Sequence, residues 1–160
     1  MKNVGVSRYH YGIYLYSSSN NTIENNTILN NNRAGIYLWG IALGSSSNNT
    51  IANNTIWNNG GGIRLWDYNN LIYNNLFNNT ENFYISNSQN TWNTTLQQGR
   101  NILGGNWLGG NAWLNPDGTG YSQTCNDFDG NGICDQPYVI NGNNIDYLPL
   151  SVAPTPQKQI

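Results

Sequence analysis

Isolated apolar residues recur through the first half of the chain between runs of asparagine, serine and threonine. The motif Asn-Asn-Thr-Ile-x-Asn-Asn-Thr-Ile occupies residues 20–28, returns at residues 48–56, and returns in an altered form at residues 69–77. A second motif, Gly-Ile-x-Leu-x, precedes these copies at residues 12–16, 35–39 and 62–66. Its alternation is typical of a half-buried strand, and nothing here has a sustained helical period. The pattern therefore predicts short strands separated by asparagine corners.

A single copy of this repeat cannot bury its own apolar side chains, so the copies must stack along an axis. Stacked strands lie ~4.8 Å apart and set like residues above one another. Such regular apolar positions argue against a disordered asparagine-rich tract. We expect an all-β fold, a single-stranded right-handed parallel β-helix or solenoid, because parallel crossovers are almost always right-handed. Its expected apolar ladders are Ile13/Ile36/Ile63, Leu15/Leu38/Leu65, Ile23/Ile51/Ile72 and Ile28/Ile56/Leu76, with Phe77 as the alternative to Leu76.

Asparagine has a physical role at the corners of such a coil. It is a poor strand residue, but it tolerates the left-handed backbone conformation and its side chain bonds its own backbone. Stacked asparagines also bond amide to amide along the axis of stacked strands. We expect two ladders of this kind at equivalent corners, Asn25/Asn53/Asn74 and Asn26/Asn54/Asn75.

The 160 residues are enough for one domain, in which composition separates three segments. Residues 1–96 are expected to form the rungs of the coil, with a loop inserted at residues 40–47. From residue 97 glycine and tryptophan become frequent, and we expect residues 97–150 to form an irregular cap over the C-terminal strand edges of the coil. Residues 151–160 contain prolines and are expected to form an extended tail.

Only 9% of the residues are charged, and the net charge is −2. This balance offers no electrostatic surface to nucleic acid or to an anionic membrane. There is no apolar run of membrane-spanning length, and the first residues lack the apolar core of a signal peptide. Because the chain starts within a predicted rung, we expect a domain of a longer secreted protein, or a subunit whose open end meets another copy.

The repeat and the C-terminal block together resemble the NosD-type β-helix repeat family of archaeal and bacterial secreted or surface proteins. The matching order in the C-terminal block is Asn106-Trp107, Gly109-Gly110-Asn111, Trp113, Asp127 to Ile133, Asp135, Pro137-Tyr138 and Asn143 to Pro149. The resemblance covers most of residues 12–150 and implies a location outside the cell or on its surface. Some members are linked to copper delivery, and others have sugar-active or structural roles.

The segment from Asp127 to Asp135 has the ligand spacing of a calcium loop. Loop positions 1, 3, 5 and 9 carry oxygen-bearing side chains, those of Asp127, Asp129, Asn131 and Asp135. Glycine stands at position 6, and the backbone carbonyl of Ile133 at position 7 would be the fifth ligand. Tyr138 stands at position 12, where a calcium loop has a bidentate glutamate. We expect a structural Ca²⁺ completed by Asp146 or a carbonyl; the alternative is a plain turn with solvated carboxylates.

Cys125 and Cys134 bracket this loop, and a disulfide between them would contribute roughly 2–3 kcal/mol. The even cysteine count and the low charge suit an oxidising compartment. As soft copper ligands the pair is a poorer fit, since copper sites usually recruit histidine and methionine as well. The chain has one histidine, His10, and one methionine, Met1. We therefore do not carry over the copper association of the family, and we expect His10 to be an ordinary rung residue.

In each Gly-Ile-x-Leu-x motif the isoleucine and leucine point inward, so the x residues point outward. Two outer rows are expected, Tyr14/Tyr37/Arg64 and Tyr16/Trp39/Trp66. A flat aromatic strip of this kind can bind sugar rings or another protein. Alternatively, the side chains only stabilise the sheet by stacking on one another.

Catalysis has little support, because glycoside hydrolysis needs two positioned carboxylates. Outside the calcium-like loop the acids are scattered: Glu24, Asp67, Glu81, Asp117 and Asp146. We expect a non-catalytic extracellular or cell-surface module, a structural or adhesive scaffold that self-associates or meets a neighbouring surface protein. A carbohydrate-binding module is the alternative, ahead of a polysaccharide-active enzyme or a copper-binding protein. Asn-x-Ser/Thr sequons leave N-glycosylation open at Asn20, Asn48, Asn78 and Asn93.

Overall fold

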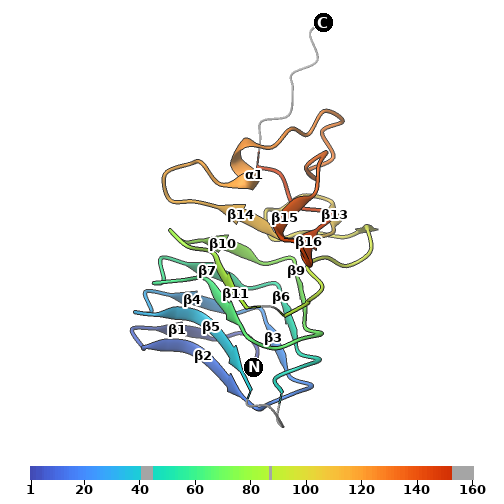
Figure 1. Ribbon diagram of the computed structural model, residues 1–160. Helices are drawn as coiled ribbons and strands as arrows, with labels where there is room; N and C mark the ends of the chain where they lie inside the picture. Colours follow the sequence, from blue (N-terminus) through green and yellow to red (C-terminus); the bar gives the residue numbers. More distant parts are fainter. Residues whose placement is uncertain (41–44, 87, 153–160) are drawn as a thin grey trace, which may run out of the picture.

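A computed structural model describes residues 1–40, 45–86 and 88–152. Three parallel β-sheets form the body of the molecule, and each sheet is built from strands of successive rungs (Figure 1). The four-stranded sheet has the order β11-β8-β5-β2 and contains β2 (Tyr11–Tyr16), β5 (Ala34–Trp39), β8 (Ile63–Leu65) and β11 (Phe83–Ile85). The five-stranded sheet has the order β1-β4-β7-β10-β14 and contains β1 (Gly5–Ser7), β4 (Thr27–Leu29), β7 (Thr55–Trp57), β10 (Leu76–Asn78) and β14 (Ala112–Leu114). The three-stranded sheet contains β3 (Thr22–Glu24), β6 (Thr50–Ala52) and β9 (Leu71–Tyr73). The chain visits the sheets in turn, so the fold is all-β and β-helix-like.

The C-terminal third combines one further strand of the coil with irregular structure. Strand β14 extends the five-stranded sheet beyond β10, with Trp113 opposite Phe77. Two antiparallel pairs lie beside it, β12 (Gln97–Gln98) with β13 (Trp107–Leu108) and β15 (Tyr138–Asn141) with β16 (Asn144–Asp146). The segment Tyr121–Thr124 forms a short helix, α1. The centre of the predicted loop, residues 41–44, and most of the predicted tail, residues 153–160, lie outside the described residues.

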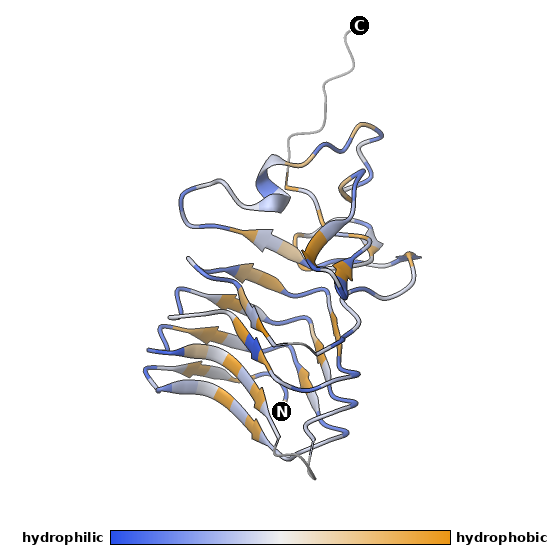
Figure 2. Cartoon of the chain, viewed as in Figure 1, coloured by the Kyte–Doolittle hydropathy of each residue, from blue (hydrophilic) through white to orange (hydrophobic). Residues whose placement is uncertain are grey.

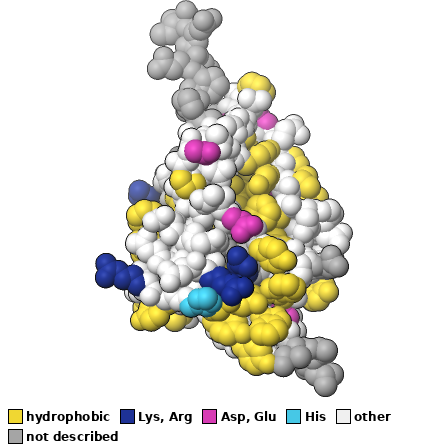
Figure 3. All heavy atoms as spheres, turned by 60° about the vertical axis from the view of Figure 1, so that its left-hand side comes forward, with side chains coloured by type: hydrophobic (Ala, Val, Ile, Leu, Met, Phe, Trp, Pro, Cys, Tyr) yellow, Lys and Arg dark blue, Asp and Glu magenta, His cyan; other side chains and the backbone are white. Residues whose placement is uncertain are grey.

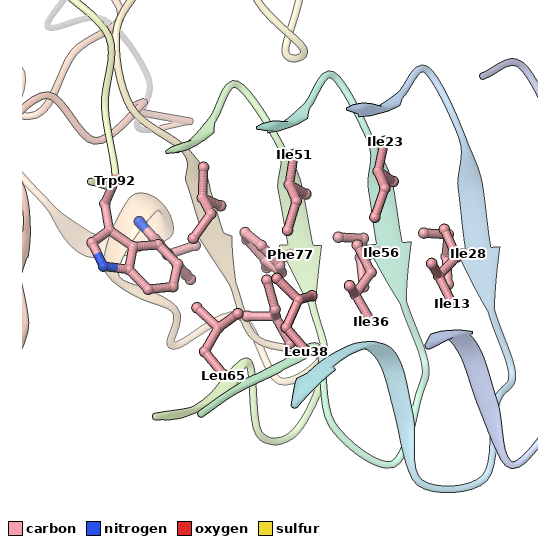
Figure 4. Packing of buried hydrophobic residues seen from close by; sticks show 13 residues of the cluster. Ile13, Ile23, Ile28, Ile36, Leu38, Ile51, Ile56, Leu65, Phe77 and Trp92 are labelled. Atoms are coloured by element: carbon pink, nitrogen blue, oxygen red, sulfur yellow. The ribbon is translucent and has the colours of Figure 1, made fainter. Parts of the chain in front are cut away.

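The predicted apolar ladders run through the interior of the coil. Ile23, Ile51 and Ile72 are in register across β3, β6 and β9, and each is almost completely buried. The isoleucine and leucine ladders of the four-stranded sheet are also in register across β2, β5 and β8. Figure 4 shows these side chains meeting between the sheets, with Trp92 at one end of the row. Figure 2 shows the same regularity along the chain, with apolar strands between polar corners.

The third member of the fourth ladder is Phe77, so the prediction of Leu76 was wrong and its alternative was right. Phe77 pairs with Ile56 and is fully buried, whereas Leu76 pairs with Thr55. Successive strand residues point to opposite faces, so residue 76 takes the outward position that threonine has in the earlier copies. Leu76 is half-buried there, against a second apolar cluster that includes Ala112, Ile133 and Leu150.

The two asparagines of each Asn-Asn corner have different structural roles. The first asparagine adopts a left-handed backbone, with φ of 57° at Asn25, 58° at Asn53 and 52° at Asn74. The second points inward, and its backbone N–H and its Nδ2 both donate to Oδ1 of the equivalent asparagine one rung further along. The predicted inner ladder is confirmed and is one member longer than expected: Asn26, Asn54, Asn75 and Asn111.

Two further inner ladders, which were not predicted, follow the same rule up to their last members. Their donor–acceptor distances run from 2.8 to 3.2 Å, and their members are Asn21, Asn49, Asn70, Asn90 and Asn144, and Asn31, Asn59, Asn79 and Asn82. Asn90 donates only its backbone N–H to Asn144, and Asn82, the acceptor for Asn79, lies three residues further along the chain and not one rung. The second of these ladders explains the glycine that opens each Gly-Ile-x-Leu-x motif. A Cβ on Gly35 would lie 2.7 Å from Cγ2 of Ile56 and 3.1 Å from Nδ2 of Asn59. The chain can pass this close to the ladder only as glycine.

The C-terminal segment closes the coil through buried polar groups. Asn144 of β16 ends one ladder and also accepts the indole N–H of Trp92 at 2.9 Å. Asp146 of the same strand accepts the backbone N–H of Asn111 at 2.8 Å and the indole N–H of Trp113 at 2.9 Å. Short hydrogen bonds from one hairpin strand therefore attach the C-terminal segment to the last rung.

Candidate functional site

The outer face of the four-stranded sheet carries the two predicted rows. Tyr14 lies opposite Tyr37, Tyr37 opposite Arg64, and Tyr16 opposite Trp39. The alternation that buries Ile36 and Leu38 sends their neighbours outward, as the motif predicts. Tyr14, Tyr16, Trp39 and Trp66 are 41–46% exposed on this face.

Two aromatic residues that the sequence analysis left out join these rows. Tyr84 of β11 pairs with Arg64 and is 44% exposed, and Tyr11 of β2 contacts the rings of Tyr14 and Tyr37. The alternation of Phe83, Tyr84 and Ile85 is the signal that could have placed Tyr84 in the row. We call the whole set the aromatic face: Tyr11, Tyr14, Tyr16, Tyr37, Trp39, Arg64, Trp66 and Tyr84.

Ring contacts order the aromatic face from rung to rung. Tyr14 and Tyr37 have centroids 5.2 Å apart and planes within 14°, and the planes of Tyr37 and Trp39 lie within 6°. On the next rungs Trp66 contacts Tyr84 at 5.6 Å. Each such pair is worth roughly 0.5–1.5 kcal/mol beyond area burial. The rings therefore stabilise the sheet, and five of these aromatic side chains still remain more than two-fifths exposed.

Positive charge gathers at one edge of the aromatic face. The Arg64 guanidinium lies 5.5 Å from the centroid of the Tyr84 ring, and its Nη2 is 3.8 Å from the exposed Glu81 carboxylate. Burial raises the pKa of the Tyr37 phenol, and the positive charges of Arg33 and Arg64 oppose this rise. Figure 3 shows Lys and Arg side chains with the histidine beside them, bordering the hydrophobic surface. His10 itself packs edge-on against Tyr11 at 4.6 Å.

The calcium-like loop folds around its own acidic side chains. Asp127 is buried; its two oxygens accept the backbone N–H groups of Asn131 at 3.1 Å and Gly132 at 2.9 Å. Asp129 accepts the same Asn131 N–H at 3.1 Å, and Asp135 accepts the N–H of Phe128. The turn depends on Gly130 and Gly132, whose φ values are 70° and 87°. Two carboxylates therefore converge on one N–H group.

The loop side chains fit a hard cation in donor type, because carboxylate and amide oxygens are the ligands that Ca²⁺ prefers. No Lys or Arg forms an ion pair with them among the described residues. Within the same residues, however, no group of three or more His, Cys, Asp or Glu side chains has a metal-binding arrangement. Asp146, considered above as a completing ligand, is instead bound to Asn111 and Trp113. Cys125 and Cys134 form the expected disulfide, with Sγ atoms 2.09 Å apart, so neither is a free thiol.

The remaining acids and the sequons lie on separate parts of the surface or in the core. Among the described residues, no hydrogen bond or shared donor joins two acidic side chains outside the loop. Glu24 forms an ion pair with Lys2, Asp67 and Asp146 are buried, and Glu81 and Asp117 lie in exposed turns. Of the sequon asparagines, Asn20 and Asn48 are exposed, whereas Asn78 and Asn93 are half-buried.

These features define a class: an all-β protein of parallel sheets built from stacked rungs, with rows of exposed aromatic side chains on one outer face. Residues 1–118 match the family model described as periplasmic copper-binding protein (NosD). The match spans well over half of the chain, and the protein belongs to the NosD family, as the repeat motif indicated. No curated protein matches the chain. No solved structure matches it either.

Family membership supports a periplasmic or extracellular β-helix protein. No helix in the described part of the chain is long and apolar enough to cross a membrane. The copper in the family description does not fit the donors of this chain. Both cysteine sulfurs are in the disulfide, His10 packs on Tyr11, and Met1 lies exposed at the N-terminus. These residues offer no set of soft ligands around one point, so we derive no copper chemistry for them.

Proposed function

We propose that the protein is a non-catalytic extracellular or cell-surface module, a right-handed β-helix solenoid that acts as an adhesive scaffold and binds polysaccharide with its aromatic face. The observation that carries this proposal is the alignment of eight residues on one outer sheet, five of them aromatic side chains more than two-fifths exposed: Tyr14, Tyr16, Trp39, Trp66 and Tyr84. Regular rungs hold these groups in fixed positions. A rigid, preorganised surface loses little entropy when it binds an extended ligand.

The chemistry of the aromatic face suits sugars. A sugar ring combines apolar C–H faces with hydroxyl groups, and tyrosine and tryptophan combine apolar rings with O–H or N–H groups. Phenols have a pKa of about 10 and are protonated at neutral pH, so Tyr14 and Tyr37 can donate hydrogen bonds; burial raises the pKa of both further. The scattered acids support a binding role in place of hydrolysis, because no evident pair of carboxylates faces a common substrate position.

Binding to soluble polysaccharides tests the proposal, with migration retardation in gels that contain each polymer as the measurement. We expect Trp39→Ala and Trp66→Ala each to weaken binding roughly tenfold, because each removes the contact between one indole ring and the sugar, worth about 1–2 kcal/mol of binding free energy. Trp57→Ala is the matched control, since Trp57 is 41% exposed on β7 of a different sheet. Absence of retardation by any polymer, or an equal loss in the Trp57 variant, would contradict the proposal.

A protein partner is the second candidate for the aromatic face, since exposed aromatic surface of this extent also marks protein interfaces. The partner would be a neighbouring surface protein or a second copy of the chain. Sedimentation of the protein at increasing concentration separates the two readings. Self-association that Trp39→Ala and Trp66→Ala abolish would favour this candidate over the polysaccharide.

We also propose that the loop from Asp127 to Asp135 binds a structural Ca²⁺. Support comes from the convergence of Asp127 and Asp129 on one N–H group and from the disulfide that holds the loop ends together. A bound cation would remove the repulsion between the two carboxylates and tie the loop to the end of the coil. Its role would be to stiffen the C-terminal segment and not to take part in chemistry.

Removal of calcium tests this site by calorimetric unfolding. We expect a chelator to lower the melting temperature by roughly 5–10 °C, since Ca²⁺ at a hundred times its Kd stabilises a protein by about 2.7 kcal/mol. Asp129→Asn should remove the difference between calcium and chelator, because Asp129 is exposed and contributes charge more than packing. Asp117→Asn, in an exposed turn, should keep the difference. A melting temperature that does not respond to chelator would eliminate the site.

A further inference from the structure

We infer that the polysaccharide bound by the aromatic face is acidic, with uronic acid carboxylates that pair with Arg33 and Arg64. This inference rests on the proposed function and specifies its ligand class. The two arginines belong to adjacent rungs: Arg33 directly precedes β5, and Arg64 lies in the middle of β8. Arg64 follows Tyr14 and Tyr37 in the outer row. The Arg33 backbone N–H donates to the carbonyl oxygen of His10 at 2.9 Å, beside the Tyr11 end of the same face, and the charges of both arginines act to lower the pKa of Tyr37.

The first support is that this positive charge is not fully compensated. The chain has a net charge of −2 and only six basic residues, yet two of them border one aromatic surface. Arg33 is exposed and forms no ion pair within the described residues. Arg64 has only the 3.8 Å contact with Glu81, which is 56% exposed at its side chain. A surface pair of that length contributes little and leaves the guanidinium available to a ligand.

The second support is the state of Arg64. Its Nε is buried without a hydrogen-bond partner, and its Nη2 lies 3.8 Å from the Glu81 carboxylate. Gly61 leaves room beside it, since a Cβ there would lie 3.6 Å from Nε and 3.8 Å from Nη2. The guanidinium carbon lies 5.5 Å from the centroid of the Tyr84 ring, and packing against this ring restricts its movement. An arginine held in this way loses little entropy when it forms a bidentate contact with a planar carboxylate.

A uronic acid residue matches both halves of the surface at once. Its ring offers the apolar C–H face that the tyrosine and tryptophan side chains require, and its carboxylate projects from the edge of the same ring. A neutral sugar would satisfy the rings and leave the arginines without a partner. An acidic peptide would satisfy the arginines but has no stiff, repeating apolar face for the successive rungs. The combination of charge and rings therefore favours an acidic polysaccharide.

Short oligomers of galacturonic acid, compared with their methyl esters, test the inference by titration calorimetry. The ester keeps the sugar backbone and removes the charge. We expect the acid form to bind about tenfold more tightly than the ester, with an affinity that falls as salt is added. Arg33→Gln should weaken binding of the acid roughly fivefold to tenfold and leave binding of the ester unchanged. Arg100→Gln, an exposed arginine of the C-terminal segment, is the control and should change neither.

Glu81→Gln provides a second variant with the opposite sign. Removing the carboxylate that faces Arg64 should strengthen binding of the acid form severalfold, and circular dichroism checks that the fold is kept. Equal binding of acid and ester would overturn the inference while leaving the proposed function intact. Absence of binding to both forms would count against both. Binding of the acid form that survives Trp39→Ala and Trp66→Ala would also overturn the inference, because the aromatic face would then not be needed. Binding of dextran sulfate as tight as that of the acid form would overturn it too, because charge alone would then explain the affinity.

Discussion

Replacing Asn54 by alanine is expected to destabilise the protein by roughly 3–5 kcal/mol, measured by urea unfolding. Asn54 is fully buried in the middle of the predicted inner ladder. Its Oδ1 accepts two N–H groups of Asn26, and its Nδ2 donates to Oδ1 of Asn75 and to the carbonyl oxygens of Ile23 and Ala52. Alanine would remove these bonds, at about 1–3 kcal/mol for each buried group left without a partner. Oδ1 of Asn75 would keep the backbone N–H of residue 54, and Nδ2 of Asn26 would keep the carbonyl oxygen of Met1.

Asn32→Ala is the matched control for this variant, because Asn32 is exposed and lies outside the ladder. Its expected effect is within about 0.5 kcal/mol. Asn54→Asp tests the hydrogen bonds separately from the volume of the side chain. It keeps the volume but replaces the donor Nδ2 by an acceptor oxygen that faces two carbonyl oxygens. We expect Asn54→Asp to be at least as damaging as alanine at neutral pH. A loss below about 1 kcal/mol for both variants would show that the ladders are not a main source of stability.

Stability is expected to fall as the pH rises from about 4 to about 7, and Asp146 is expected to cause most of this slope. Asp146 is completely buried, and burial raises its pKa to about 7 against the opposing effect of the N–H donors of Asn111, Trp113 and Leu148. At pH 5 the folded protein keeps this proton, whereas the unfolded chain, with a carboxyl pKa of about 3.9, has lost it. Because the native state binds more protons, the free energy of unfolding decreases with pH, by up to roughly 4 kcal/mol in total.

Urea unfolding between pH 4.5 and pH 8 measures this dependence, with Asp146→Asn as the variant that cannot titrate. The substituted amide must direct its N–H₂ group at one of the surrounding donors, so we expect the variant to be less stable than the parent at pH 5 by roughly 1–3 kcal/mol. Its stability should also change less with pH. Asp67, whose pKa burial raises as well, contributes a smaller slope of the same sign that persists in the variant. Equal pH slopes in parent and variant would show that Asp146 is not the titrating group.

The repeat motif was sufficient to predict how the rungs stack. A strand that alternates inward and outward residues fixes the neighbours of Ile23, Ile36 and Leu38 once like motifs are placed above one another. The same rule placed Tyr14, Tyr37 and Arg64 in one outer row. Leu76 shows its limit, because the last member of a ladder depends on counting positions in an imperfect copy. The calcium loop and the sugar-binding role remain predictions.

The closure of the coil could not be predicted from the repeat. Asn144 joins Asn90 over 54 positions of sequence, and Asp146 joins Asn111 over 35. No motif marks either residue as a member of a ladder, since β16 belongs to an antiparallel hairpin and not to a rung. A local pattern states which face a residue occupies. It does not state which distant segment covers the last rung.

By itself, the sequence determined the architecture of the rungs, because regular spacing of isoleucine, leucine and asparagine leaves only one way to bury the first two and bond the third. It also determined which side chains point outward from the four-stranded sheet. Only the tertiary structure decided how the coil ends and where charge meets the aromatic face. Those arrangements join Asp146 to Trp113 and Arg64 to Tyr84 across connections of irregular length, where contact depends on three-dimensional packing.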